Sequence, residues 1–138
     1  MFELEINGKV YGFKFGIGFV RTINSKMTKP MEGVPGQKQE IGLSYYIGAM
    51  YDEDPIALVE VLATANMTEK ERVARKELDK YIDDVTTDID ALFEDVRHFL
   101  KSANATKKVA LELDEMYKIE KMKAEAAKAK AKAEAAVV

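Results

Sequence analysis

The side chains that could carry chemistry in this chain are few. His98 is the only histidine, and without any cysteine the chain can form neither a thiolate site nor a disulfide. His98 lies between Arg97 and Phe99 beside an apolar stripe, so we interpret it as a structural residue. The serines stand in no nucleophile-elbow context. We therefore expect no catalytic residue and no enzyme activity.

A run of carboxylates is the feature that most resembles a metal site, because Mg²⁺ and Ca²⁺ prefer oxygen ligands. The acidic residues are Asp83, Asp84, Asp88, Asp90, Glu94 and Asp95. A helix–loop–helix calcium site needs a glycine at its sharp turn, and this stretch has none. Asp90 and Glu94 flank apolar positions, as solvated residues do. We expect no metal site.

The glycines in "YGFKFGIGF" raise the question of phosphate binding. Gly12, Gly16 and Gly18 do not follow the G-x-G-x-x-G order, and no Lys-Ser/Thr pair follows them as in a P-loop. Gly12 is better explained by crowding in a strand, and Gly16 and Gly18 by a corner. We expect no cofactor site.

Adaptable apolar side chains are more prominent than polar groups that could react. Methionine fills gaps in cores, but it is also favoured at adaptable binding surfaces, and tyrosine is enriched at interfaces. Met31 lies in a Pro/Gly loop, and three tyrosines crowd one short helix. We predict a surface for a client or for self-association formed by Met31, Tyr45, Tyr46, Met50 and Tyr51. The alternative is a rim of half-buried tyrosines with methionines in the core.

The first 15 residues predict a β-hairpin. Apolar residues alternate, and Asn7-Gly8 suits a two-residue turn that places Phe2 opposite Phe13. One face then carries Phe2, Leu4, Ile6, Tyr11, Phe13 and Phe15. An isolated hairpin is marginally stable, so we expect this face to pack on helices of the same chain. Its outer edge offers a template for pairing with another subunit.

Helical patterns follow. A stripe of Phe19, Val20, Ile23 and Met27 predicts the first helix, and an exposed Pro/Gly-rich loop comes after it. A second helix is predicted from about Ile41 to Tyr51, with Leu43, Tyr46, Ile47 and Met50 buried. A third starts with Asp54 as N-cap and Pro55 as first residue, and carries Ile56, Leu58, Val59, Leu62 and Ala65.

The second half of the chain is more regular. Thr68 and Glu71 fit a capping box at the start of a further helix. An a/d spacing then runs through Leu78, Ile82, Val85, Ile89, Leu92, Val96 and Phe99. The β-branched pair Thr86-Thr87 and the N-cap residue Asp88 predict a break between two helices. One continuous helix is the alternative.

The last helix is predicted to begin near Lys107, after a link in which Asn104 or Thr106 is the cap. It should bury Val109, Leu113, Met116 and Tyr117. Beyond Ile119 the chain is almost entirely Ala, Lys and Glu, which predicts a solvated, fraying tail.

The expected fold class is therefore α+β, mainly α. An N-terminal hairpin packs on a bundle of about five helices in residues 1–119, and residues 120–138 form a helical or frayed charged tail. The net charge of −3 argues against nucleic-acid binding. No apolar run approaches the ~20 residues that span a bilayer, and no signal-peptide layout is present, so we expect an intracellular protein without a membrane partner.

Several phrases together resemble a known family. They are "INGKVYGFKFG", "INS", "IGL", "DPIALVEVLATA", "ELDKYIDD" and "DIDALFEDVRHFLKSAN", followed by the Lys/Ala/Glu-rich tail. This order is similar to the tail assembly chaperones of long-tailed phages (siphophages) that infect Gram-positive bacteria. The resemblance covers residues 2–104.

The resemblance implies a non-enzymatic protein of the host cell cytoplasm that is absent from the mature virion. Such chaperones bind the tape measure protein, keep it soluble and help recruit tail tube subunits. Implied partners are the tape measure protein, the major tail tube protein, further copies of the chain and a longer frameshifted version of it. Two alternatives are a structural component retained in a tail or another assembly, and a nucleic-acid-binding regulator that uses the lysine-rich tail.

Overall fold

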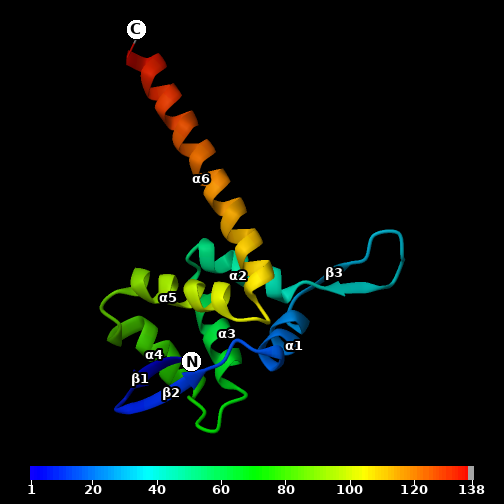
Figure 1. Cartoon of the computed structure of the whole chain (residues 1–138), viewed down its shortest axis with the longest axis vertical. Coiled ribbons are helices and arrows are strands. Elements are labelled where there is room, and N and C mark those ends of the chain that lie inside the picture. The colour runs from blue at the N-terminus through cyan, green and yellow to red at the C-terminus, as the bar shows by residue number, and fades with distance from the viewer. Residues whose placement is uncertain (137–138) are drawn as a thin grey trace.

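The N-terminal hairpin forms as predicted. The structure, a computed structural model, describes residues 1–136, and in it β1 (Phe2–Ile6) and β2 (Lys9–Phe13) pair antiparallel (Figure 1). Phe2 lies opposite Phe13, as the two-residue turn requires. Asn7 and Gly8 at the turn have φ of 54° and 78°, the left-handed values that these residue types tolerate.

The apolar face of the hairpin packs on helices of the same chain, which confirms the prediction. The Phe2 ring lies 5.7 Å from that of Phe13 and 5.1 Å from that of Phe99, on α5 (Ile89–Ser102). Phe15 meets Phe19 of α1 (Ile17–Ser25) edge-on at 5.2 Å. These ring pairs bury the hairpin face between the two helices.

The outer edge of β2 is bound to the end of α3 (Pro55–Asn66) instead of to another strand. The Lys14 amide donates to the Ala65 carbonyl at 2.9 Å, and Asn66 Nδ2 donates to the Gly12 carbonyl at 2.8 Å. Both backbone groups face away from β1 in this register. Part of the β2 edge is therefore already hydrogen-bonded within the chain and is not available for the predicted pairing with another subunit.

The segment between α1 and α2 (Gly42–Tyr51) corrects the prediction of a loop. It forms a β-ribbon in which β3 (Thr28–Pro30) pairs antiparallel with β4 (Lys38–Glu40), and the ribbon projects from the body (Figure 1). All six strand residues are exposed, as expected of the segment. Three-residue strands without an apolar face leave no alternating pattern to detect.

Two helix starts follow the predicted capping. Asp54 Oδ1 accepts from the Ile56 amide at 3.0 Å at the start of α3, with Pro55 as first residue. Asp88 Oδ1 accepts from the Ala91 amide at 3.0 Å at the start of α5. The predicted break is confirmed, because α4 (Arg75–Lys80) and a π-helical turn, η1 (Tyr81–Val85), end before it.

The capping box predicted at Thr68 and Glu71 is wrong. Residues 67–74 form a loop that the buried Asn66 side chain organises, and α4 begins only at Arg75. Asn66 Nδ2 donates to the Glu71 carbonyl at 3.0 Å, and Asn66 Oδ1 accepts from the Val73 amide at 2.8 Å. These bonds satisfy the loop backbone without a helical turn.

The core lies where α1, α2, α3 and α5 meet beneath the hairpin. Its largest fully buried apolar side chains are Phe13, Phe19, Ile23, Ile47, Met50, Leu58, Leu62, Leu78, Leu100, Val61 and Val96. The predicted apolar positions Ile56 and Val85 are instead exposed. α1 and α2 approach so closely that a Cβ on Gly42 would lie 1.8 Å from the Ile23 carbonyl oxygen.

The last helix, α6 (Lys107–Ala136), begins at the predicted residue and projects far from the body (Figure 1). Ala110 and Asp114 are buried, and Val109 and Leu113 are partly buried. Met116 and Tyr117 were expected in the core but are exposed, because α6 leaves the body at that point. The tail is helical through Ala136 and exposed from Glu115 to Ala136, and the last two residues of the predicted tail, 137–138, lie outside the described residues.

The predicted fold class, α+β and mainly helical, is thus confirmed, with six α-helices within residues 1–136. Within residues 1–136, each helix is either too short or too polar to span a bilayer.

Candidate functional site

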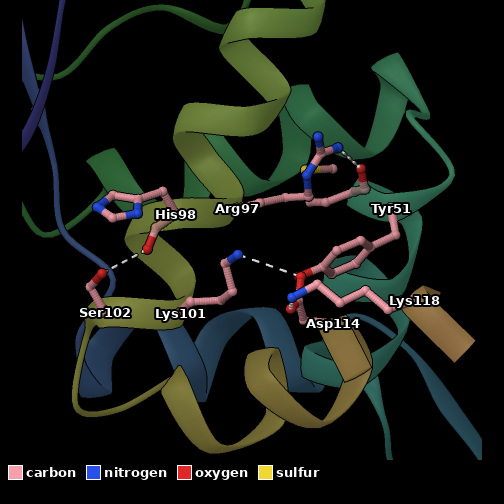
Figure 2. Close-up of polar contacts among 8 residues, drawn as sticks. Tyr51, Arg97, His98, Lys101, Ser102, Asp114 and Lys118 are labelled. Carbon is pink, nitrogen blue, oxygen red and sulfur yellow. Dashed lines mark hydrogen bonds and ion pairs between the residues drawn. The ribbon is translucent and has the colours of Figure 1, made fainter. Parts of the chain in front are cut away.

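The polar residues singled out from the sequence do not converge on a reaction centre. His98 is exposed, its ring lies edge-on to Phe99 with centroids 5.9 Å apart, and its carbonyl accepts from Ser102 Oγ at 2.8 Å (Figure 2). Within residues 1–136, no three His, Asp or Glu side chains gather in a way that could hold a metal ion.

A polar cluster that the sequence did not predict joins three helices (Figure 2). We call Tyr51 of α2, Lys101 of α5, and Asp114 and Lys118 of α6 the Asp114 cluster. Asp114 Oδ1 accepts from the Tyr51 hydroxyl at 2.8 Å and lies 3.4 Å from Lys101 Nζ. Asp114 Oδ2 lies 2.8 Å from Lys118 Nζ. The cluster fixes the first turns of α6 to the body.

The electrostatics of this cluster suit a structural joint. Burial disfavours the charged form of Asp114, but hydrogen bonds from Lys118 and Tyr51 and the charges of Lys101 and Lys118 outweigh it and lower the pKa of the carboxyl group. Burial, and then the hydrogen bond to Asp114, raise the pKa of the Tyr51 hydroxyl. Near neutral pH the tyrosine therefore stays a neutral donor and the aspartate an ionised acceptor, so neither can exchange a proton easily.

Arg97 of α5 adds a second link to the end of α2. Its Nη1 donates to the Met50 carbonyl at 2.9 Å, and its guanidinium lies 5.5 Å from the centroid of the Tyr51 ring. A further ion pair joins it to Glu53 at 3.9 Å. The arginine thus adds a second donor to a carbonyl that also accepts from the Glu53 amide at 3.4 Å, and it lies over an aromatic face.

An apolar groove of about 860 Å³ lies beside the hairpin, and we call it the N-terminal groove. It lies between the hairpin, the start of α1 and the end of α5. Its apolar lining includes Met1, Phe2, Phe15, Ile17, Phe99 and Ala103. Ile17 and Met1 are 63% and 70% exposed, so the groove is open to a partner. Isolated exposed apolar residues are common, but a contiguous apolar patch is often functional.

A second groove of about 420 Å³ lies between α2 and α6, and we call it the α2–α6 groove. Its aromatic and apolar lining includes Tyr45, Tyr51, Leu113, Met116 and Tyr117. Its charged lining residues are Asp52, Asp54 and Glu120, all of them acidic. Tyr117 stacks on Tyr51 with centroids 5.1 Å apart, which shapes one wall.

The five residues of the predicted client surface do not form one patch in the structure. Met31 is 38% exposed on the projecting ribbon, whereas Tyr45 is 48% exposed and lines the α2–α6 groove. Tyr46 is partly buried and meets Tyr45 edge-on at 5.1 Å.

Met50 and Tyr51 correct the prediction of a surface. They are 0% and 9% exposed, because α2 packs against both α5 and α6 and so has more than one buried side. The accessible part of the predicted surface is therefore Met31, Tyr45 and Tyr46, and its binding role stays a prediction.

Sequence reasoning also missed exposed residues. The sequence pattern predicts Met116 and Tyr117 in a buried stripe and gives Ile17 no role. The shift to Ala, Lys and Glu just after Tyr117 was a usable signal that the helix leaves the body there. Ile17 lies between Gly16 and Gly18, and nothing in its periodicity marks it as exposed.

Comparison with known proteins identifies a family for most of the chain. The profile of a family described as "Phage tail assembly chaperone protein, TAC" matches residues 3–115. The matched range spans nearly all of the hairpin, α1 through α5 and the docked turns of α6. Searches of curated proteins and of solved structures give no match.

Proposed function

Because the chain belongs to the phage tail assembly chaperone family, we propose that it binds the tape measure protein and keeps it soluble during tail assembly. A tape measure protein is a long helical chain whose apolar stripes have no partner before the tube forms around it. A protein that holds such a chain must offer apolar surface and itself remain dispersed. Charges of both signs on the surface serve the second need.

The N-terminal groove is the observation that carries this proposal. Its exposed aliphatic residues, Ile17 and Met1, lie next to buried phenylalanines, so a client side chain can enter a preformed apolar site. Such a groove suits an amphipathic helix, whose apolar residues recur on one face. Methionine at the rim can adapt to different client side chains.

The wider assignment follows the same reasoning. The chaperone would act in the cytoplasm of a host cell, and we place it with long-tailed phages of Gram-positive bacteria. It would help recruit major tail tube subunits, associate with a longer frameshifted version of itself, and be absent from the mature virion. Mass spectrometry of purified particles tests the last point, since stoichiometric presence would favour a retained structural component.

Co-expression with tape measure segments tests the central claim. The variant Ile17→Lys places a charge in the N-terminal groove at an exposed position, so the fold should tolerate it. Ile56→Lys is the matched control, because Ile56 is 76% exposed and lines neither groove. We expect the native chain and Ile56→Lys to raise client solubility and Ile17→Lys to lose this effect. Equal client solubility with and without the native chain would refute the proposal.

A further inference from the structure

Charge is divided sharply between the body and the projecting helix. Residues 118–136 hold six lysines and three glutamates, a net charge of +3. The whole chain has 21 basic and 24 acidic residues, so the remainder has 15 and 21, a net charge of −6. A basic rod and an acidic body on one molecule attract each other between copies.

Apart from the ion pair between Lys118 and Asp114, the part of the basic rod that the structure describes is exposed to solvent. Every residue from Glu115 to Ala136 is exposed, and the 19 residues from Lys118 onward span about 28 Å at the rise of an α-helix. The tail is continuous with the docked part of α6 and points away from the body (Figure 1). It could reach its own α2 only by breaking the helix.

The α2–α6 groove has the chemistry to receive such a rod. Its exposed Tyr45, Met116 and Tyr117 offer aromatic and thioether surface, and its acidic lining includes Asp52 and Glu120. Lysine stems and alanine methyl groups pack on tyrosine rings, while the ammonium groups lie over the ring faces or reach the carboxylates. Among the described residues that line the groove, none is basic and would repel them.

We propose that the α2–α6 groove of one copy receives the lysine-rich end of α6, residues 128–136, from a second copy. The groove lies at the root of the same helix that ends in the basic tail. Two antiparallel α6 helices therefore place each tail at the partner's groove, and both contacts form at once. The result is a closed two-fold dimer, in which one surface patch meets another reciprocally. This inference does not depend on the identity of the client.

Sedimentation velocity over a range of concentrations and salt tests the proposal on the full chain. The native chain should dimerise with increasing concentration, and added salt should weaken the dimer because exposed charges are screened. A groove-reversed variant combines Asp52→Lys with Glu120→Lys, and a tail-reversed variant combines Lys128→Glu with Lys130→Glu. Each should raise the dissociation constant at least about tenfold, since attractive contacts become repulsive.

A mixture of the two variants distinguishes the proposed contact from a general charge effect. In a mixed dimer, the reversed groove of one chain receives the reversed tail of the other. The native groove of the second chain receives the native tail of the first, so both contacts are attractive. The mixture should therefore recover dimers that neither variant forms alone. Lys107→Glu with Lys108→Glu is the matched control, because it makes the same change on exposed residues of the same helix outside the tail. It should dimerise like the native chain.

Three results would overturn the proposal. One is a native chain that stays monomeric at every concentration, which would leave the groove for a basic segment of another protein. The second is a mixture that fails to recover dimers. The third is an equal loss in the Lys107 and Lys108 control. If the groove-reversed variant does not fold, a chain that ends at Ile119 replaces it in the test, because this chain lacks the tail. It must remain monomeric at concentrations at which the native chain dimerises.

Discussion

Removal of the Asp114 carboxylate should detach the first turns of α6 from the body. Asp114→Ala leaves the Tyr51 hydroxyl, which is buried with it, without its acceptor, and it also leaves Lys101 and Lys118 unpaired. A hydrogen bond to a charged group contributes about 1.5–3 kcal/mol. The Lys118 side chain is 65% exposed, so solvent screens its ion pair with Asp114 and this pair adds little. We therefore expect Asp114→Ala to lower the free energy of unfolding by about 2–4 kcal/mol.

Urea unfolding followed by circular dichroism measures this loss through the transition midpoint at constant slope. Tyr51→Phe is the matched control, because it removes only the hydroxyl group, and it should cost about 1–2 kcal/mol. The double variant Tyr51→Phe, Asp114→Ala should cost less than the sum of the single losses, since both remove the same bond. Additive losses, or a loss below about 0.5 kcal/mol for Asp114→Ala, would contradict the assigned role of the cluster.

The same cluster sets a pH dependence. The carboxyl pKa of Asp114 is lower in the folded chain than its unfolded value of 3.8. The native state therefore binds the proton less tightly, so the ionised group stabilises the fold above pH 3.8 and loses this effect as pH falls below it. The stability difference between the native chain and Asp114→Asn should be constant near neutrality and shrink below that pH. If the stability difference between the two chains grows on acidification, the pKa of Asp114 is not lowered on folding and the prediction is wrong.

Gly42→Ala should prevent folding or cost more than about 3 kcal/mol, because its Cβ would overlap the Ile23 carbonyl oxygen, and thermal unfolding measures this. Gly48→Ala is its control on the same helix, has open space around the added Cβ, and should stabilise by up to about 1 kcal/mol. Asn66→Ala removes three hydrogen bonds to backbone groups and should cost about 2–3 kcal/mol in urea unfolding, so a loss under about 0.5 kcal/mol would contradict its role. A chain ending after Ile119 should keep the native melting temperature within a few degrees, because the removed residues that the structure describes are exposed, and a larger drop would show that the tail supports the body.

Local chemistry made part of this structure predictable. The Asn7-Gly8 turn set the register of the hairpin, because a two-residue loop allows one pairing that keeps the aromatic residues on one face. Asp54 and Asp88 marked helix starts because short acceptor side chains satisfy free amides. These signals act within a few residues and hardly depend on the rest of the fold.

Long-range contacts limited the rest. The burial of Met50 and Tyr51 depends on α5 and α6, which pack on α2 from far along the chain, as in the Tyr51–Asp114 bond between residues 63 positions apart. Asn66 binds the Glu71 carbonyl and the Val73 amide and so holds a loop where the capping box at Thr68 predicts a helix, and its other partner, Gly12, lies 54 positions away. No local pattern shows such contacts. The grooves arise in the same way, since their walls come from distant segments.

The contact between Phe2 and Phe99 also has a consequence during synthesis of the chain on the ribosome. The hairpin emerges first, but 84 residues, from Gly16 to Phe99, must be added before α5 can shield it. At 5–20 residues per second this takes about 4–17 s. Throughout that interval the nascent chain presents its own phenylalanines to the crowded interior of the cell. During its synthesis, this member of a chaperone family therefore exposes apolar side chains that need shielding, as we propose for its client.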